Sequence, residues 1–370
     1  MVSRNQPIWA SFSDVRSVPA GEVSLKSHAT IFDALRLLDQ TACQIVLVVS
    51  DDGRLVGVAT DGDLRRALLG GSNLESPVAA AVNRDFHSVR SGYESSVTVP
   101  LLEARGIRQV PVVDENGCPV ELLILGSMSP SPGRPNRVVI MAGGRGLRLR
   151  PLTDHRPKPL LAIGGVPILE LIIRNYASQG FRRFTIVVGY LSEQIERYFQ
   201  NGSKFGVSIE YLREEQPMGT AGSLKEISED GGPSIVVSNA DVLTSLDLGA
   251  MVDSHESSGC SLTIAVRREE ISISYGVITR DDHTVISWQE KPKISFEVSA
   301  GVYVLDPAAI SVLDGGPSDF PDLVAKLLED GKPVGSFEFD GLWMDVGTHD
   351  NFLAAVTLAG FPGDTGDVER

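Results

Sequence analysis

A short stretch of the chain combines glycines with a cluster of positive charge. Residues 141–160 read Met-Ala-Gly-Gly-Arg-Gly-Leu-Arg-Leu-Arg-Pro-Leu-Thr-Asp-His-Arg-Pro-Lys-Pro-Leu, with Asp154 as the single acid. The whole protein has a formal net charge of −15 at pH 7, so this positive charge is local. A glycine-rich turn after a strand can aim backbone N–H groups at an anion. The stretch therefore predicts a binding site for a polyphosphate.

Lys158 lies between Pro157 and Pro159, which restrict the backbone on both sides of it. A rigidly held ammonium group suits a phosphoryl group that is being transferred. The glycines match neither the P-loop pattern G-x-x-x-x-G-K-[ST] nor the dinucleotide pattern G-x-G-x-x-G. We therefore expect a phosphate site of another kind.

The elements around this stretch predict a Rossmann-like α/β fold with a mixed, mostly parallel sheet. Apolar runs indicate strands at 137–140, 184–188, 207–212, 234–238 and 262–266. Helices are expected at 167–178 and at 192–200, with Ser192 as the N-cap of the second. Alternating strands and helices favour a parallel sheet covered on both faces, which binds ligands at the carboxyl ends of its strands.

An offset of 64 residues aligns the first third of the chain with itself. It places Leu37-Leu38 on Leu101-Leu102 and Val48-Val49 on Val112-Val113. Each copy is expected to fold as helix, strand, acidic turn and strand, at 31–40, 45–49, 50–53 and 55–59 in the first copy. Two copies are typical of a unit whose half cannot cover its own apolar face.

This repeat resembles the CBS domain pair, a smaller α/β unit. The segment Gly57-Val-Ala-Thr-Asp-Gly-Asp63 matches the family's nucleotide-binding motif, and only the first copy carries it. The resemblance implies an adenine nucleotide at the pair, with Thr60 at a phosphate or ribose and Asp63 at a ribose hydroxyl. A pair that serves dimerisation or packing is the alternative.

A segment rich in proline and serine, at 127–136, is expected to be a linker. We expect a flexible N-terminus at 1–10 and the CBS pair at 11–126, with copies at about 11–70 and 75–126. The second domain is expected at 137–370.

The chain has 370 residues, enough for two or three domains. Its acidic balance argues against nucleic-acid binding, which requires a basic face. The three cysteines form no C-x-x-C pair, which fits a reducing compartment. The N-terminus lacks the apolar core of a signal peptide, and no apolar run approaches the ~20 residues of a membrane span. We therefore expect a cytoplasmic protein that binds neither nucleic acid nor membranes.

The second domain resembles the sugar-1-phosphate nucleotidylyltransferases from Arg137 to about Leu358. These enzymes join a nucleoside triphosphate (NTP) to a sugar 1-phosphate and release pyrophosphate. The resemblance implies that Arg148 and Lys158 are catalytic and hold the phosphates. The residues that it implies at the nucleotide are Ala142, Gly143, Gly144, Gly146, Gln216, Gly219 and Thr220. For Thr220, the alternative is a helix cap before 221–227.

Further motifs follow in the family's order. Asn239-Ala-Asp241 and Trp343-Met-Asp345 imply a Mg²⁺ ion held by Asp241 and Asp345. The residues implied at the sugar are Tyr275, Gly276, Glu290, Lys291, Ser299 and Gly301. The sequence departs from the family's usual residues at Ala240 and Ser299, where glycine and asparagine are common.

A CBS pair before a short transferase resembles the glucosamine-1-phosphate guanylyltransferases of the legionaminic acid pathway. This resemblance implies GTP and glucosamine 1-phosphate as substrates, a product used as a cell-surface polysaccharide precursor, and a homo-oligomer. Mannose- or heptose-1-phosphate guanylyltransferases and N-acetylmuramate-1-phosphate uridylyltransferases share most of these residues. An alternative of another class is a non-catalytic regulator that binds a nucleotide sugar, with the CBS pair as an adenylate sensor.

Overall fold

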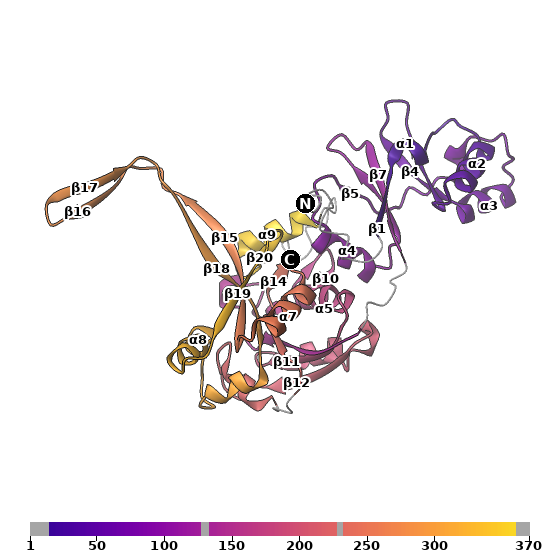
Figure 1. The fold of residues 1–370 in the computed structure, drawn as a ribbon. Coiled ribbons are helices and arrows are strands. Elements are labelled where there is room, and N and C mark those ends of the chain that lie inside the picture. The colour runs from indigo at the N-terminus through magenta and orange to yellow at the C-terminus, as the bar shows by residue number, and fades with distance from the viewer. Residues whose placement is uncertain (1–14, 127–132, 228–231, 360–370) are drawn as a thin grey trace. The chain divides into compact units, whose positions relative to one another are not determined.

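The computed structural model describes residues 15–126, 133–227 and 232–359 (Figure 1). The expected N-terminal segment 1–10 and residues 127–132 of the expected linker lie outside this range. Contacts group the chain into two compact units. The first unit contains Met1–Gly133, Gly146–Gly180 and Met344–Arg370, and the second contains Arg134–Arg145 and Phe181–Trp343.

The first unit contains the repeat. One copy consists of β2 (Ser24–Lys26), α2 (Ile31–Thr41), β3 (Ile45–Val49) and β4 (Leu55–Thr60). The other copy consists of β5 (Val89–Arg90), α4 (Ser95–Ala104), β6 (Gln109–Val113) and β7 (Pro119–Leu125). Ile45 pairs with Thr60 in the first copy, and Gln109 pairs with Ile124 in the second. The strand register therefore repeats at the same 64-residue offset as the sequence.

The two copies form separate sheets with their own cores. The first sheet has the order β2-β3-β4, and the second has the order β1-β7-β6-β5, with β1 at Val15–Pro19. The strands β3 and β6 are buried along most of their length, as their continuous apolar runs require. The remaining elements of this part are α1 (Ala20–Val23), α3 (Asp61–Leu69) and the 3₁₀ turn η2 (Val78–Ala81).

Helix α4 of the repeat packs on later segments of the same unit. These segments contain η3 (Leu147–Leu149), η4 (Lys158–Leu160), β9 (Ala162–Ile163), β10 (Val166–Pro167), α5 (Ile168–Ser178) and α9 (His349–Leu358). The guanidinium of Arg105 donates to the carbonyl of Gly164 with an Nε–O distance of 3.0 Å. A Cβ on Gly164 would lie 2.6 Å from Leu101, so only glycine permits this approach. The N–H of Glu94 also donates to the carbonyl of Leu358, over 3.3 Å.

A seven-stranded sheet forms the centre of the second unit. Its order is β12-β11-β8-β13-β18-β15-β19. The bounds are β8 (Arg134–Ala142), β11 (Phe181–Val188), β12 (Ser208–Arg213), β13 (Ile235–Asn239), β15 (Leu262–Ser272), β18 (Lys293–Leu305) and β19 (Val334–Glu338). Only β18 is antiparallel to its two neighbours, and the other neighbouring pairs are parallel. The expected mixed, mostly parallel sheet is therefore confirmed.

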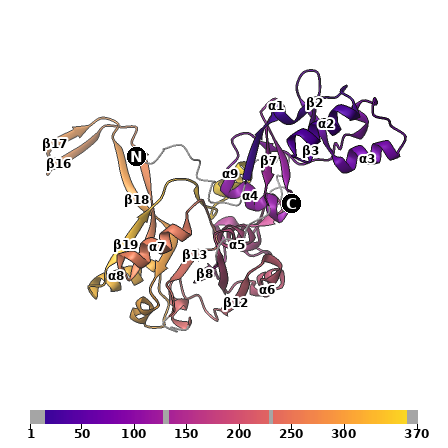
Figure 2. The ribbon, with the colours of Figure 1, turned by 45° about the vertical axis from the view of Figure 1, so that its right-hand side comes forward.

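Helices and short turns complete the second unit. They are α6 (Ser192–Phe199), α7 (Leu248–Ser258), α8 (Phe320–Glu329), η5 (Ser203–Phe205), η6 (Gly222–Glu226) and η7 (Pro307–Val312). Helix α6 lies beside β12 (Figure 2). The second unit also contains the short strand β14 (Val242–Thr244), while the short strand β20 (Trp343–Asp345) crosses into the first unit. The ring of Tyr303 stacks on that of Phe320 with centroids 3.6 Å apart, which fixes the start of α8 over the sheet.

One local expectation is wrong. Helix α6 begins at Ser192, but its N-cap is Leu191, in a left-handed conformation with φ = 52° and no side-chain cap bond. The backbone turn after β11 starts this helix without the serine hydroxyl. None of the described helices is long and apolar enough to span a membrane.

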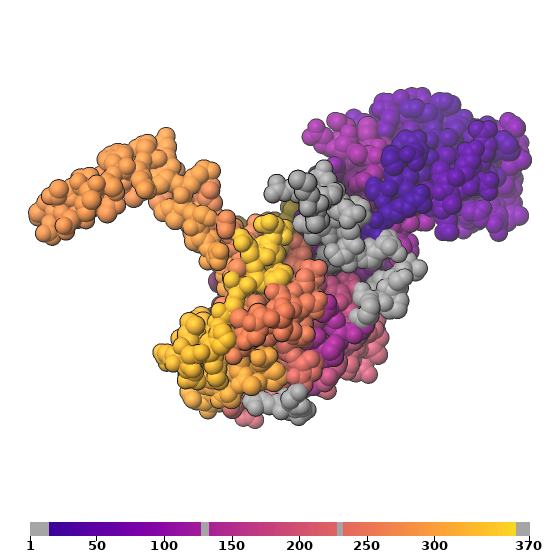
Figure 3. All heavy atoms as spheres, in the orientation of Figure 1, coloured from indigo at the N-terminus to yellow at the C-terminus, as the bar shows by residue number. Residues whose placement is uncertain are grey.

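Strands β15 and β18 continue beyond the sheet as an arm (Figure 1). The arm ends in a hairpin of β16 (Val277–Asp281) and β17 (Thr284–Gln289). The space-filling view shows the arm in orange as a narrow extension, and its apolar side chains are exposed (Figure 3). Among them are Tyr275, Ile278, Ile286 and Trp288.

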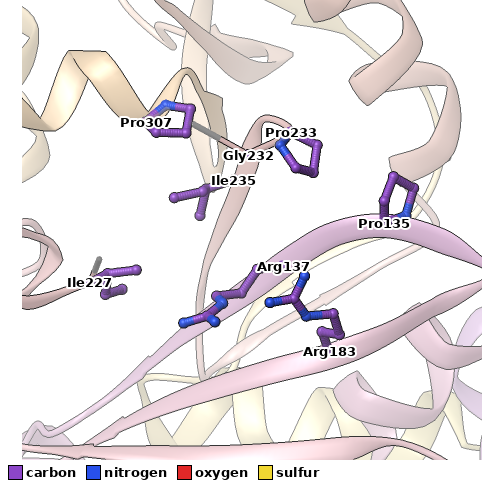
Figure 4. A pocket seen from close by; sticks show the side chains of 8 residues that line it. All are labelled: Pro135, Arg137, Arg183, Ile227, Gly232, Pro233, Ile235 and Pro307. Carbon is purple, nitrogen blue, oxygen red and sulfur yellow. The ribbon is translucent and has the colours of Figure 1, made fainter. Parts of the chain in front are cut away.

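A pocket of about 190 Å³ lies at the amino ends of β8, β11 and β13 (Figure 4). Arg137 and Arg183, which are register partners on β8 and β11, line it with Pro135 and Ile235. None of the expected nucleotide or sugar residues lines this pocket. The candidate site is at the other, carboxyl ends of these strands.

Candidate active site

The glycine loop begins where the parallel strands end. Ala142 closes β8 opposite Val188 of β11, and Met141 is opposite Asn239 of β13. Gly143 and Gly144 follow directly and leave the sheet at its carboxyl edge. The strand-end position expected from the sequence is therefore confirmed, and it is where such sheets bind ligands.

Gly143 is glycine because other groups approach it closely. A Cβ on Gly143 would overlap Oε2 of Glu214, and a Cβ on Gly189 would lie 2.9 Å from the Gly143 carbonyl oxygen. Tyr190 donates its N–H to that carbonyl over 3.3 Å. The loop backbone is thus held between the turn after β11 and a carboxylate.

Glu214 is a site residue that the sequence analysis missed. It follows β12, and its N–H donates to the carbonyl of Val188 over 2.8 Å. Its Oε1 accepts from the hydroxyl of Ser223 over 2.5 Å, which leaves Oε2 beside Gly143. The position after a strand of the parallel sheet was the signal that could have identified it. Gln216, which was expected at the base, is exposed two residues further on.

Gly219 and Thr220 contact the start of α8. Gly219 has φ = 77°, and a Cβ there would lie 2.5 Å from the carbonyl oxygen of Ser318. The hydroxyl of Thr220 lies 3.0 Å from Asp319 Oδ1 and accepts from the N–H of Phe320 over 3.0 Å. The helix cap expected at Thr220 for 221–227 is therefore wrong, because Ala221 precedes the short η6 and Thr220 binds α8.

Asp241 follows β13 at the same carboxyl edge. The N–H of Ala240 donates to the carbonyl of Met141 over 3.2 Å, so this turn is fixed to the end of β8. Ala240 is 5% exposed, and its methyl group is accommodated where glycine is common. Asn239 packs on Gly301, because a Cβ on Gly301 would lie 2.7 Å from Asn239 Nδ2. Asp241 is thus placed beside the beginning of the glycine loop.

The first unit brings Arg148, Lys158 and Asp345 together around Gly347. The point that a Cβ on Gly347 would occupy is 2.6 Å from Asp345 Oδ1, 2.8 Å from Arg148 Nη2 and 3.2 Å from Lys158 Nζ. Lys158 Nζ lies 4.0 Å from Asp345 Oδ1. Residues almost 190 positions apart therefore form one cluster of two cations and a carboxylate.

Local structure holds these side chains in place. Pro157 precedes η4, and the Lys158 side chain is only 12% exposed. Gly146 has φ = 62°, and a Cβ there would lie 3.1 Å from Lys158 Cβ. Asn351 of α9 donates its side-chain N–H to the carbonyl of Asp345 over 2.7 Å. The lysine and the aspartate are therefore both attached to rigid turns.

The surroundings of the Asp345 carboxylate suit a metal ligand. Its Oδ1 is buried and accepts no hydrogen bond from the part of the chain that the structure describes. A buried carboxylate oxygen without a donor is costly unless a cation meets it. Carboxylate oxygens are also the protein ligands that Mg²⁺ prefers, together with waters and phosphates.

The expected sugar residues lie along the arm and its base. Tyr275 is 78% exposed just before β16, and Lys291 has a left-handed φ of 45°. The Trp288 indole donates to Glu290 Oε2 over 3.2 Å, and its ring lies against Gly276. Nearer the sheet, Ser299 Oγ lies 3.1 Å from the Tyr303 hydroxyl, whose pKa is raised by burial. Ser299 therefore contacts a neutral phenol on its own strand.

The two copies of the repeat line a second pocket, of about 340 Å³, and Thr60 is one of its residues. The second copy contributes Arg108 and Gln109 to it. Asp63 does not line the pocket: its carboxylate accepts from the N–H and hydroxyl of Thr60, over 2.8 and 2.6 Å, and pairs with Arg66. Burial opposes ionisation, but these hydrogen bonds outweigh it and lower the pKa of Asp63.

A glycine loop at the carboxyl ends of a mostly parallel sheet is the arrangement of nucleotide-binding α/β proteins. The nucleotidyl transferase family model matches residues 137–359, and the CBS domain model matches residues 15–70. The chain belongs to the nucleotidyl transferase family and carries a CBS domain at its N-terminal side.

Curated relatives agree with this assignment. The chain is 33% identical over 241 residues to a UTP–glucose-1-phosphate uridylyltransferase of Synechocystis sp., covering 60% of this chain and 62% of that protein. It is 33% identical over 230 residues to a mannose-1-phosphate guanyltransferase of Saccharomyces cerevisiae, covering 60% and 63%. The chain thus spans less than two thirds of the length of these relatives.

A solved structure, HddC from Yersinia pseudotuberculosis, matches 60% of this chain and 98% of its own, with a TM-score of 0.48 and 22% identity.

Proposed function

We propose that this protein transfers a nucleotidyl group from an NTP to a sugar 1-phosphate and releases pyrophosphate. The observation that carries the proposal is the cluster of Arg148, Lys158 and Asp345 around Gly347. A sugar phosphate is already an anion at neutral pH, so the reaction requires positioning and charge stabilisation rather than a general base. Two cations can hold the phosphates, and a carboxylate can hold a divalent ion beside them.

We propose Mg²⁺ as the cofactor, with Asp345 and Asp241, the carboxylates of the two expected metal motifs, as its protein ligands. The buried, undonated Oδ1 of Asp345 supports this assignment. Bound Mg²⁺ would neutralise charge on the reacting phosphates. Arg148 and Lys158 would hold the phosphates from the protein side, and the rigid turns around Lys158 would keep its ammonium group oriented.

We propose GTP as the preferred nucleotide, because a carboxylate lies beside the glycine loop. The Oε2 of Glu214 is adjacent to Gly143, and its Oε1 already accepts from Ser223. A carboxylate only accepts hydrogen bonds, and guanine offers adjacent N1–H and N2–H₂ donors. Uracil presents one N–H between two carbonyl oxygens, which a carboxylate repels, so guanine is the better match.

For the sugar, glucosamine 1-phosphate remains the first candidate, since the CBS pair before a short transferase resembles that subgroup. Mannose, heptose and N-acetylmuramate 1-phosphates are the alternatives. The product would be a nucleotide sugar used as a cell-surface polysaccharide precursor, made in the cytoplasm by a homo-oligomer.

A pyrophosphate-release assay with four NTPs and this panel of sugar 1-phosphates tests the proposal, with Mg²⁺ and with a chelator. Release with one NTP and one sugar, lost on chelation, is the expected result. If no pair releases pyrophosphate while a nucleotide sugar binds in calorimetry, the chain is the regulator and not an enzyme.

Exchanging Glu214 for glutamine should change the nucleotide preference. The Glu214→Gln amide keeps one acceptor and adds a donor that matches uracil O4, so the KM for GTP should rise by about 10-fold or more. The ratio of kcat/KM for UTP over GTP should rise with it. The exposed neighbour Glu215 provides the control, since Glu215→Gln should leave both constants unchanged. An unaltered GTP preference in Glu214→Gln would remove the basis for choosing GTP.

We also propose that an adenine nucleotide binds the CBS pocket, which Thr60 and Arg108 line. Asp63 would act there by orienting Thr60, because its carboxylate holds the Thr60 hydroxyl. Asp63→Ala should therefore weaken AMP binding, measured by calorimetry.

Asp33→Ala is the matched control for this substitution. Asp33 forms the same capping box with Thr30 at the start of α2, and neither residue lines the pocket. Both variants lose a helix cap, and only Asp63→Ala should lose affinity. Equal AMP affinities in the two variants would contradict the role of Asp63.

A further inference from the structure

We infer that the pocket at the amino ends of β8, β11 and β13 is a second anion site, which binds the phosphate group of a small phosphate monoester through Arg137 and Arg183. The proposed reaction does not use this pocket, and the inference does not depend on that reaction. None of the binding motifs in the sequence includes either arginine.

The two arginines face the same side of neighbouring strands. Arg137 of β8 is the register partner of Arg183 of β11. Ile235 of β13 comes directly before the Val236–Val138 pair and so extends the same row. Neighbouring strands lie about 4.8 Å apart, and register partners on them point to one face of the sheet. Both arginine side chains therefore extend from the strands into one pocket (Figure 4).

This arrangement leaves positive charge that the chain neutralises only in part. The exposed side chain of Arg183 forms no hydrogen bond or ion pair with the described residues. The side chain of Arg137 is 23% exposed, and its Nη1 lies 3.5 Å from Oε2 of Glu210 on β12. Glu210 is 67% exposed, so this ion pair is weak. Like charges on adjacent strands repel each other, and an anion between them would relieve the repulsion.

A second polar group on this face of β11 also lacks a partner. Side chains alternate along a strand, so Thr185 shares the face of Arg183. The Oγ1 of Thr185 is buried and forms no hydrogen bond within the described residues, which is costly for a hydroxyl. Thr185 does not line the pocket, but its neighbours on this face, Val139 and Val187, belong to the apolar core. Polar groups therefore occupy rows of this face where packing alone favours apolar ones.

The lining of the pocket indicates the class of ligand. A guanidinium presents a fork of N–H donors that fits the oxygens of a phosphate or a carboxylate. Two guanidinium groups suit a phosphate monoester, with its charge of about −2, better than a carboxylate with a single charge. The remaining lining residues are apolar or glycine: Pro135, Ile227, Gly232, Pro233, Ile235 and Pro307. They provide a second wall for the organic part of the ester.

The size of the pocket limits that organic part. Its volume of about 190 Å³ is below the roughly 300 Å³ at which sites for drug-sized ligands begin. A whole nucleotide is therefore too large, and a phosphate group with a few carbon atoms attached is the better match.

The pocket is separate from the candidate active site. Strand β8 leads from Arg137 to Gly143, and β11 leads from Arg183 to Gly189. At a rise of about 3.3 Å per residue, β8 covers about 20 Å between these two ends. A small molecule bound at the arginines does not reach the glycine loop, so the two sites can be tested independently.

Calorimetry with phenyl phosphate and with inorganic phosphate tests the inference. Phenyl phosphate adds a small apolar group to the phosphate, so it should bind more tightly than inorganic phosphate. Arg183→Gln should weaken the binding of phenyl phosphate about 10-fold or more, because charge-assisted hydrogen bonds are lost. Arg137→Gln should have a similar effect, and each variant should keep the circular dichroism spectrum of the parent protein.

Two matched variants make the test specific. Arg182→Gln removes the same charge from the adjacent position of β11, whose side chain points to the other face, and should leave the affinity unchanged. Glu210→Gln removes the carboxylate that pairs with Arg137, so it should tighten binding about 2- to 5-fold. A general disturbance of the sheet would weaken binding in both cases and would not produce this opposite change.

A variant of the active site separates this pocket from the proposed reaction. Lys158→Ala should still bind phenyl phosphate, and Arg183→Gln should weaken that binding as it does in the parent protein, whether or not the parent releases pyrophosphate. Binding that is lost in Lys158→Ala and kept in Arg183→Gln would place the anion in the active site and overturn the inference. An absence of binding by the parent, or an equal loss in Arg182→Gln, would overturn it as well.

Discussion

Lys158→Ala should lower turnover by about 10²–10³-fold, the usual cost of removing one fixed group that stabilises transition-state charge. The side chain is 12% exposed, and its Nζ is 4.0 Å from Asp345 Oδ1. Pro157 and Pro159 hold the backbone on both sides, so a free amine in solution should restore activity poorly. The measurement is kcat for pyrophosphate release at saturating substrates.

Lys204→Ala is the matched control for Lys158→Ala. Lys204 is exposed in η5 and lies over the rings of Tyr198 and Phe205. This variant should keep its turnover, and both proteins should keep the circular dichroism spectrum of the parent. A Lys158→Ala enzyme with near-normal kcat would contradict the assigned role.

Gly347→Ala should lower turnover by about 10²-fold, although it touches no substrate. The added methyl would lie 2.6, 2.8 and 3.2 Å from Asp345 Oδ1, Arg148 Nη2 and Lys158 Nζ. These atoms are the ends of flexible side chains, so the fold can accommodate the methyl by moving them. The groups that move are those proposed to bind the phosphates and Mg²⁺, and a displacement of about 1 Å can cost that much.

Gly316→Ala provides the control for Gly347→Ala, because a Cβ on Gly316 meets nothing within 4 Å. It should behave as the parent protein does. Gly347→Ala should also require a higher Mg²⁺ concentration for half-maximal activity. A normal Mg²⁺ requirement together with normal kcat would show that the cluster around Gly347 is not the catalytic one.

Much of the fold could be predicted because it rests on local patterns. Continuous apolar runs placed β3 and β8, and the 64-residue offset predicted a register that the structure reproduces from Ile45 and Gln109. The prediction of Ser192 as an N-cap was wrong, because a left-handed Leu191 begins that helix. Residue type indicates which residues can cap the start of a helix. The conformation of the preceding backbone determines which residue occupies the N-cap position.

The contacts within the candidate site could not be predicted from its motifs. Gln216 belonged to the expected base-reading segment, yet Glu214 is the residue whose carboxylate lies against Gly143. Thr220 was expected at the nucleotide or at a helix cap, and it binds the start of α8, a hundred residues later. The position of Glu214 directly after a strand marked it as a candidate, but neither contact itself can be inferred from the spacing of nearby residues.

The sequence by itself determined the class of fold, the internal repeat and the position of the basic glycine loop at the end of a strand. These follow from periodicity and residue type, which act over a few neighbouring positions. Only the tertiary structure decided that Gly347 lies beside Arg148 and Lys158, and that Arg137 and Arg183 line one pocket. Such contacts join separate strands and turns, and they depend on how the chain closes around its core rather than on any local preference.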